Sequence, residues 1–251
     1  MANLTVSTLK EALEKNRDEI SVSLNDTMKT DFFIKSVMMS VHKNPKLLNC
    51  EPTSVVTAIQ ECAMLGLFPS TGLISLIPYK GKAKAIIEYK GLIALASDSG
   101  KVSAIDAEVV YDSDKFNFQH GSRPFLDHIP TIPRKEGDKI RCAYALVRFK
   151  DGGIQFRVME KPEIDAIKNG TSFPNPVWES HYNEMAKKTV FRRLAKMLDL
   201  SPKFNYAANS NEEELPMLPP EPVEQPKEVT APSLKLRDPN EVAKEAEELF
   251  Q

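Results

Sequence analysis

Residues 175–200 constrain the fold of this chain most strongly, because they fit one long helix with sharply different sides. Asn175 is a residue type that favours N-caps, and Pro176 suits the first helical position, where no backbone N–H is needed. Pro202 ends the segment, since the residue before a proline is driven out of helical geometry. The pattern predicts a single helix of about 24 residues, roughly 36 Å long.

The two sides of this predicted helix differ in chemistry when successive residues are placed about 100° apart. One side is an apolar stripe of the width that faces a core: Ala186, Val190, Phe191, Leu194, Met197 and Leu198. The other side carries a basic row, continued toward the N-terminus by aromatic and other residues if the helix is unbroken: Lys188, Arg192, Arg193, Lys196, then Trp178, His181, Tyr182 and Met185. Lys187 alone among the basic residues falls on the apolar side.

The basic row has two interpretations. Like charges four residues apart repel one another, and no acidic residue is interleaved to relieve the repulsion, as a merely solvated face usually provides. A row that tracks phosphates, with aromatic rings for base stacking, is the combination found in single-strand binders. Trp178 and Tyr182 are either packed in the protein or exposed to bases. Lys187 either reaches round the helix to DNA or pairs with a buried carboxylate.

The formal net charge of −2 conceals an asymmetry along the chain. Residues 207–251 hold 11 acidic and 4 basic residues, whereas residues 1–206 hold 29 basic and 24 acidic residues. A basic body with an acidic tail suits a nucleic-acid binder.

Cysteine and histidine give no metal-ligand spacing. Cys50, Cys62 and Cys142 are far apart, which favours reduced thiols in a cytosolic protein. No apolar run is long enough for a membrane span, and no cleavable signal is recognisable at the N-terminus. We therefore expect a cytoplasmic protein with no membrane partner, no cofactor and no metal site, and leave open a Mg²⁺ dependence of DNA binding.

The first half of the chain predicts helices followed by a hairpin. Helices are expected at residues 7–16 (capped by Ser7), 30–42 and 53–65 (ended by Gly66), then strands at 74–79 and 83–89 around Gly81, and a short helix at 91–98. Lys82 and Lys84 point to one face of the second strand. No acidic residue occurs between Glu61 and Glu88, so the hairpin is either a second basic patch or a solvated turn.

The second half predicts strands before the basic helix. Strands are expected at residues 102–111, 116–118, 140–149 and 154–159, with a proline-containing loop at 121–137 and a helix at 162–168. The fold class is therefore α+β: a small antiparallel β-sheet with hairpins, packed against several helices including the long basic one.

The composition changes near residue 206, where we expect the core, residues 1–206, to end. Residues 207–237 are rich in proline and glutamate and are expected to form a disordered linker. Residues 238–251 fit a short amphipathic helix that would be marginal in water on its own.

The sequence contains no complete motif for nuclease or ATPase activity. Glu88-Tyr89-Lys90 matches the E-x-K of metal-dependent nucleases superficially, but the preceding 26 residues lack the further carboxylate that such sites need to hold Mg²⁺. The phosphate-binding loop of ATP-driven recombinases, G-x-x-x-x-G-K-[ST], is absent from the sequence. We predict a protein that is not an enzyme.

Three strings carry a resemblance to a known family: ECAMLGLFP (61–69), LIPYKGKAKAIIEYKGLIALA (76–96) and EMAKKTVFRRLAKML (184–198). Together they resemble the RecT family of phage single-strand annealing proteins, over roughly residues 30–205. The resemblance implies an α+β fold that binds DNA in a basic groove, ATP-independent annealing, and assembly into rings or helical filaments. It also implies that the protein acts together with a phage exonuclease that produces single-stranded ends.

The resemblance assigns groove residues to two of these strings: Lys90, Lys187, Lys188, Arg192, Arg193 and Lys196. Lys82 and Lys84 are added from charge alone, and Tyr89, Trp178 and Tyr182 are candidate stacking residues. Annealing breaks no bond; it requires extended strands with exposed bases and relieved phosphate repulsion, which fixed cations supply without reading sequence.

We therefore predict an ATP-independent annealing protein of phage recombination in a bacterial host, encoded by a phage or prophage. Its partners would be single-stranded DNA, the annealed duplex intermediate and further copies of the chain, because many subunits on one strand raise the affinity. The acidic tail has three candidate partners: the phage exonuclease, a host single-strand-binding protein and the protein's own basic groove. The alternatives are a single-strand binder that protects DNA without annealing and, more remotely, a metal-dependent nuclease.

Overall fold

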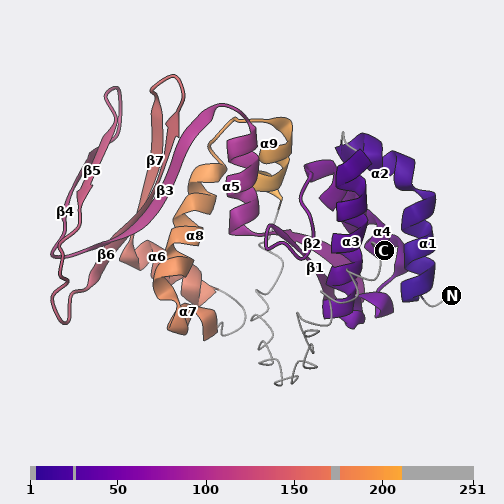
Figure 1. Ribbon diagram of the computed structural model, residues 1–251. Helices are drawn as coiled ribbons and strands as arrows, with labels where there is room; N and C mark the ends of the chain where they lie inside the picture. The colour runs from indigo at the N-terminus through magenta and orange to yellow at the C-terminus, as the bar shows by residue number, and fades with distance from the viewer. Residues whose placement is uncertain (1–3, 25–26, 171–175, 211–251) are drawn as a thin grey trace, which may run out of the picture. The chain divides into compact units, whose positions relative to one another are not determined.

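The computed structural model describes residues 4–24, 27–170 and 176–210 of the 251-residue chain. Its first part is helical (Figure 1): α1 (Val6–Lys15), α2 (Arg17–Leu24), α3 (Thr27–Lys43), the 3-10 helix η1 (Pro45–Asn49) and α4 (Pro52–Leu65). The cap of α1 is Thr5, whose side chain accepts from the N–H of Thr8, and not the expected Ser7. The sequence did not predict α2, which buries Ile20 and Leu24 but is otherwise rich in residues that form helices weakly.

The end of α4 and the hairpin after it follow the sequence closely. Gly66 adopts the left-handed conformation (φ 72°) that terminates α4, as predicted. Strands β1 (Ile74–Tyr79) and β2 (Lys82–Ile87) pair antiparallel. The two residues between them, Lys80 and Gly81, both have positive φ, which matches the right-handed twist of a tight hairpin. Helix α5 (Tyr89–Asp98) follows directly.

A three-stranded antiparallel sheet forms the second part, in the order β3 (Val102–Tyr111), β6 (Ile140–Phe149), β7 (Ile154–Glu160). The central strand β6 is buried without interruption from Cys142 to Val147, because both faces of the sheet are covered. Ala143, Ala145 and Val147 belong to the main core, whereas Cys142, Tyr144 and Leu146 belong to a second apolar cluster.

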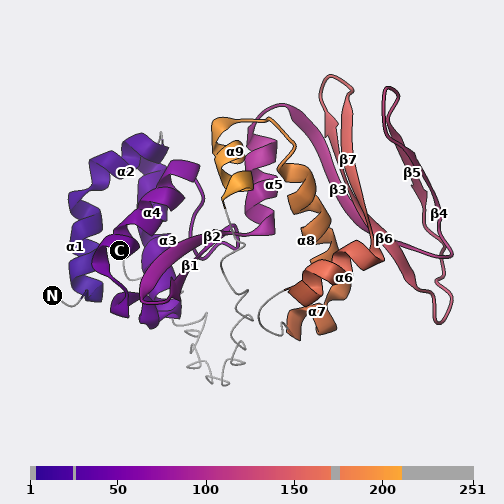
Figure 2. The same cartoon turned by 180° about the vertical axis from the view of Figure 1, so that it is seen from behind.

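The second cluster lies beneath a hairpin that the sequence did not predict in full. Strands β4 (Lys115–Gln119) and β5 (Phe125–Ile129) pair antiparallel, so the segment expected to be a loop at 121–137 contains a strand. Phe116 of β4 stacks on Tyr144 with ring centroids 5.6 Å apart. Figures 1 and 2 show this hairpin on the side of the sheet away from α8 (Tyr182–Ala195).

Asp114, whose carboxylate has no exposed surface, fixes the base of this hairpin. The carboxylate accepts from the backbone N–H groups of Tyr111 and Thr131 and from Arg134 Nη1, 3.1 Å away. His128 Nε2 lies 3.2 Å from it. Burial raises the pKa of Asp114, but these donors outweigh burial and hold that pKa well below its usual range. The hairpin is thus anchored by a buried ion cluster as well as by apolar packing.

The predicted long helix is wrong in its extent. The structure has α6 (Lys161–Gly170), then α7 (Pro176–Ser180), a break at His181, and α8. The Ser180 hydroxyl donates to the Pro176 carbonyl at 3.1 Å, a side-chain bond of the kind that bends helices. The predicted cap, Asn175, lies outside the described residues.

A further helix closes the described chain. The sequence did not predict α9 (Pro202–Asn209), which is capped by Ser201 and buries Phe204, Ala207 and Ala208. It continues across the boundary expected after residue 206. Most of the expected linker and all of the expected terminal helix lie outside the described residues.

The observed architecture is α+β, with small antiparallel sheets and several helices, and it confirms that part of the predicted fold class. Within the described ranges, no helix has both the length and the apolar character needed to cross a membrane.

Candidate nucleic-acid interface

The Tyr89-Lys90-Gly91 sequence opens α5 against the backbone of the segment that precedes β1. The carbonyl of Leu73 accepts from the N–H of Glu88 at 2.9 Å, which brings the start of the helix close to the chain. A Cβ atom on Gly91 would lie 2.1 Å from that same carbonyl oxygen. Gly91 is therefore required by a close backbone approach.

Tyr89 connects this junction to α8. Its ring meets that of Phe191 in an edge-to-face contact, with centroids 5.2 Å apart and planes at 86°. The side chain is half-buried, and burial raises the pKa of its hydroxyl. The structure therefore gives Tyr89 a packing role, and the expectation that it stacks on bases is not supported by its surroundings.

Arg192 makes the second connection, because its Nη2 donates to the carbonyl of Ile87 at 2.7 Å. The residue is half-buried, so it does not stand in an open row of cations as the sequence suggested. Lys84 and Lys90 lie three residues before and after Ile87. The hydrogen bond therefore joins α8 to the last residue of β2.

The remaining predicted cations differ in exposure. Arg193, Lys196, Lys82 and Lys90 are exposed, and Lys188 and Lys84 are half-buried. Lys84 Nζ lies 5.3 Å from the centre of the Tyr79 ring, on the neighbouring strand of the hairpin. We name these six basic residues of α8, β2 and α5 and of the C-cap of α8 the α8–hairpin surface.

Lys187 is engaged with the fold. Its Nζ lies 3.0 Å from Glu108 Oε2 on β3 and 3.6 Å from Glu184 Oε1. Partial burial lowers the pKa of Lys187, and the two carboxylates more than offset it, so the pKa is raised. Lys187 therefore pairs with carboxylates, but these are not the buried partner that the sequence led us to consider, because the side chains of Glu108 and Glu184 are 53% and 70% exposed.

Trp178 and Tyr182 correct the prediction of base stacking. Trp178 is only 2% exposed, so its ring is packed inside the protein. Tyr182 is half-buried, and its hydroxyl donates to Asp165 at 2.7 Å. The break at His181 explains the error, because a rotation of 100° per residue cannot be carried through a non-helical residue.

The apolar stripe is largely confirmed. Ala186, Val190, Phe191, Leu194 and Leu198 are at most 5% exposed. The prediction for Met197 is wrong, because this residue lies beyond the end of α8 and is 66% exposed. The prediction for Met185 is also wrong, because it was placed on the basic side and is buried.

The superficial nuclease motif has an ordinary role. Glu88 accepts from the Ser75 hydroxyl at 2.9 Å across the hairpin. Among the residues that the structure describes, no group of three or more His, Cys, Asp or Glu side chains could hold a metal ion.

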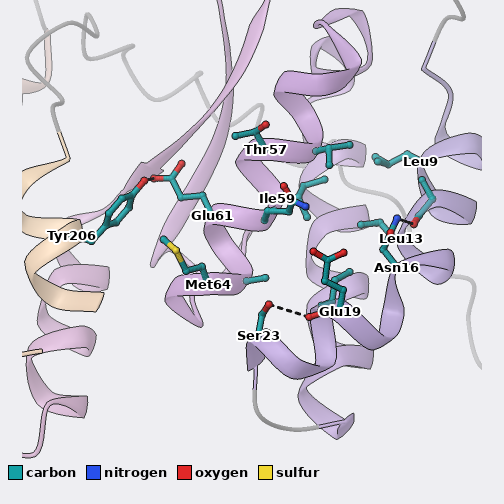
Figure 3. Close-up of a pocket in the computed structure, with 15 residues that line it drawn as sticks. Leu9, Leu13, Asn16, Glu19, Ser23, Thr57, Ile59, Glu61, Met64 and Tyr206 are labelled. Carbon is teal, nitrogen blue, oxygen red and sulfur yellow. Dashed lines mark hydrogen bonds between the residues drawn. The ribbon is translucent and has the colours of Figure 1, made fainter. Parts of the chain in front are cut away.

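A separate pocket of about 520 Å³ lies among α1, α2 and α4 (Figure 3). Tyr206 of α9 reaches it and donates to Glu61 at 3.1 Å, and burial raises the pKa of that carboxyl. The lining includes Glu19 and Glu61 but no lysine or arginine. An apolar pocket with two carboxyl groups disfavours phosphate, so we exclude it from the nucleic-acid interface.

One basic surface, on α3, was not predicted from the sequence. Lys35 and Lys43 are exposed there on the same side as an exposed aromatic ring, Phe32. The signal was present in the sequence as FFIKSVMMSVHK, but the apolar repeat of Phe33, Val37 and Val41 drew the interpretation to the core.

The fold and the contacts between α5 and α8 define a class: an α+β protein in which Tyr89-Lys90-Gly91 and Phe191-Arg192 meet at one junction that carries basic residues. The comparisons with known proteins give the family. The RecT family model matches residues 31–230, and the chain belongs to the RecT family. The match extends beyond residue 205, where the sequence resemblance was expected to end.

Two curated proteins are similar to this chain in sequence. Protein RecT of Escherichia coli (strain K12) is 34% identical over 209 residues, which cover 79% of this chain and 77% of that protein. The uncharacterized protein YqaK of Bacillus subtilis (strain 168) is 25% identical over 167 residues, covering 64% of this chain and 57% of that protein.

Proposed function

We propose that this protein binds single-stranded DNA and anneals complementary strands during homologous recombination, without ATP and without breaking a bond. Membership of the RecT family supports recombination by strand annealing in general. The exposed cations of the α8–hairpin surface support a sequence-independent grip on phosphates.

The observation that carries the proposal is the hydrogen bond from Arg192 to the carbonyl of Ile87. It holds a basic helix and a basic hairpin together at one point, so cations from distant parts of the chain lie on neighbouring elements. Such an arrangement relieves the repulsion between two phosphate backbones, which is the main obstacle to pairing of separated strands.

One subunit contacts few nucleotides, so we infer that several copies act on one strand as a ring or a helical filament. The annealed duplex intermediate would lie along the same cations. We assign the acidic tail a partner-binding role, with a phage exonuclease or a host single-strand-binding protein as the partner, in the cytoplasm of a bacterial host. We assign no cofactor. Any dependence of DNA binding on Mg²⁺ would come from Mg²⁺ acting as a counter-ion of the DNA.

Annealing of two complementary oligonucleotides, one of them fluorescent, tests the proposal. We expect the full chain to accelerate pairing equally with and without ATP, and to leave a labelled strand intact in Mg²⁺. Binding without acceleration would identify a protecting protein, and cleavage in Mg²⁺ would identify a nuclease; either result contradicts the proposal.

Salt titration tests the mechanism. Affinity for a single strand should fall steeply between about 50 and 200 mM salt, because phosphate contacts release counter-ions. Lys196→Ala and Lys84→Ala should each reduce the slope of log affinity against log salt by about 0.7. Lys15→Ala, which removes an exposed lysine from α1, is the matched control and should leave the slope unchanged.

A further inference from the structure

The outer side of α3 combines exposed apolar groups with lysines. Phe32 is 55% exposed and Met39 is 56% exposed. Helical spacing places these two on one arc with three exposed lysines, and we name the five residues the α3 face: Lys29, Phe32, Lys35, Met39 and Lys43.

The main core is formed by the side of α3 opposite Phe32. The opposite side of α3 is anchored by Phe33, Val37 and Val41, each at most 1% exposed. These residues join the main core, where α3 packs against α1, α2 and η1. An exposed phenylalanine beside an already complete core invites a functional explanation.

The ring of Phe32 is held in a defined orientation. It meets Phe68 edge-to-face, with centroids 5.2 Å apart and planes at 63°, and Phe68 also contacts Phe33 at 5.9 Å. A ring braced by a neighbour, yet more than half exposed, loses little conformational freedom when a flat ligand stacks on it.

The electrostatics of the α3 face are one-sided. Asp31 is the only acidic residue in α3, and its carboxylate is paired with Arg17 of α2. Within the described ranges, neither Lys35 nor Lys43 forms an ion pair with a carboxylate. These two lysines are eight residues apart, or about 12 Å along the helix axis. At about 3.4 Å per phosphate of a stacked strand, that distance spans roughly three to four phosphates.

We propose that the α3 face is a second contact surface for single-stranded DNA, on which an unpaired base stacks against Phe32 while Lys35 and Lys43 bind phosphates. The inference rests on the proposed function and adds a site outside the α8–hairpin surface. Base stacking on an aromatic ring combined with backbone-tracking cations is how proteins hold single strands without reading sequence.

The composition of the face favours a single strand over other anionic partners. A duplex offers no free base face to Phe32. Binding of a helix to an anionic lipid surface requires a broad apolar side to be immersed, whereas this arc offers only Phe32 and Met39.

Equilibrium binding of the full chain to a fluorescein-labelled oligothymidylate tests the inference through three substitutions of one residue. Phe32→Ala and Phe32→Leu should weaken binding about 5- to 100-fold, because both remove the π face. Phe32→Tyr should bind like the parent, since it keeps that face. The leucine variant keeps apolar volume against Phe68, so it separates stacking from folding if the alanine variant melts early.

The charge component is tested by salt titration of Lys35→Ala and Lys43→Ala, each of which should lower the slope by about 0.7. Val22→Ala and Lys15→Ala are the controls: Val22 is 75% exposed on α2, and neither residue belongs to the α3 face. Both controls should bind like the parent.

Several outcomes would overturn the inference. If Phe32→Leu and both lysine variants bind like the parent while Lys196→Ala and Lys84→Ala bind weakly, the α3 face is not a DNA site and the proposed function still stands. If the parent itself does not bind oligothymidylate, the proposed function fails first. If the Phe32 and lysine variants lose binding to phosphatidylserine vesicles while their DNA binding is unchanged, the α3 face belongs to a membrane contact instead.

Discussion

Helices α8 and α3 both carry basic residues along one side, yet they use them differently. In α8, Arg192 donates to the Ile87 carbonyl and Lys187 pairs with Glu108, so part of the charge holds the fold together. In α3, Lys35 and Lys43 project from the fold beside an exposed phenylalanine. A row of cations in a sequence therefore does not reveal how many of them remain for a ligand.

The number of neighbouring elements explains the difference. Helix α8 packs against β3, β6 and β7 on one side and against α5 and α6 elsewhere, whereas α3 packs against α1, α2 and η1. A helix with partners on more than one side has fewer positions left for solvent. Its long polar side chains then find backbone carbonyls and carboxylates within reach.

The largest change in stability is expected on the core side of α8, and it distinguishes that side from the basic side. Leu194 is 1% exposed, so Leu194→Ala should lower the free energy of unfolding by about 2–5 kcal/mol. Urea unfolding followed by circular dichroism measures this change. Normal stability in that variant, together with poor annealing, would mean that the faces of α8 are assigned the wrong way round.

Gly91→Ala tests the junction that places α5 beside α8. On helix propensity alone, this change in α5 should stabilise the protein by about 1 kcal/mol. The close approach to the Leu73 carbonyl reverses the sign, and we expect destabilisation of about 1–3 kcal/mol. Gly170→Ala in α6 is the control, because an added Cβ there meets no atom of the described residues within 4 Å. A stabilised Gly91→Ala variant would contradict the close approach.

Arg192→Ala sharpens the comparison between the two basic helices. It leaves the Ile87 carbonyl without its charged donor, so we expect a loss of about 1–3 kcal/mol in stability as well as weaker DNA binding. Lys35→Ala on α3 should change stability by no more than about 0.5 kcal/mol while weakening binding. Thermal melts and salt titrations on the same preparations separate the two effects. Equal stability of both variants would remove the distinction drawn between α8 and α3.

Lys187→Ala should have a smaller effect, because its partner Glu108 is about half exposed and such pairs contribute about 0.2–1 kcal/mol. The loss should shrink further in concentrated salt, which screens the pair. Annealing rates should stay near those of the parent. A large fall in DNA affinity with an unchanged melting temperature would return Lys187 to the DNA-binding set.

The smallest effect is expected for removal of residues 211–251, which should leave the melting temperature and annealing in vitro unchanged. A cut at residue 206 is the informative comparison, because it removes Ala207 and Ala208, both buried in α9. The shorter fragment should melt at a lower temperature. Identical melts of the two fragments would show that the second half of α9 adds nothing to the core.

The sequence alone determined the family and much, though not all, of the local structure. Periodicity and turn residues located α4 with its Gly66 terminus, the β1–β2 hairpin and the strands β3, β6 and β7 within a few residues. The strings around Tyr89-Lys90-Gly91 and Phe191-Arg192 led to the RecT family. These features depend on residues close together in the chain, and short-range chemistry is what a sequence displays directly.

Only the tertiary structure decided what individual side chains do. The helix breaks at His181, and Trp178 before the break is buried. Arg192 donates a hydrogen bond to the Ile87 carbonyl, 105 residues away in sequence. Lys187 forms an ion pair with Glu108 of β3. Each of these outcomes depends on a partner that is remote in sequence. Charge and periodicity specify which side of a helix is polar, but the elements that pack around it determine which of its charges stay in water.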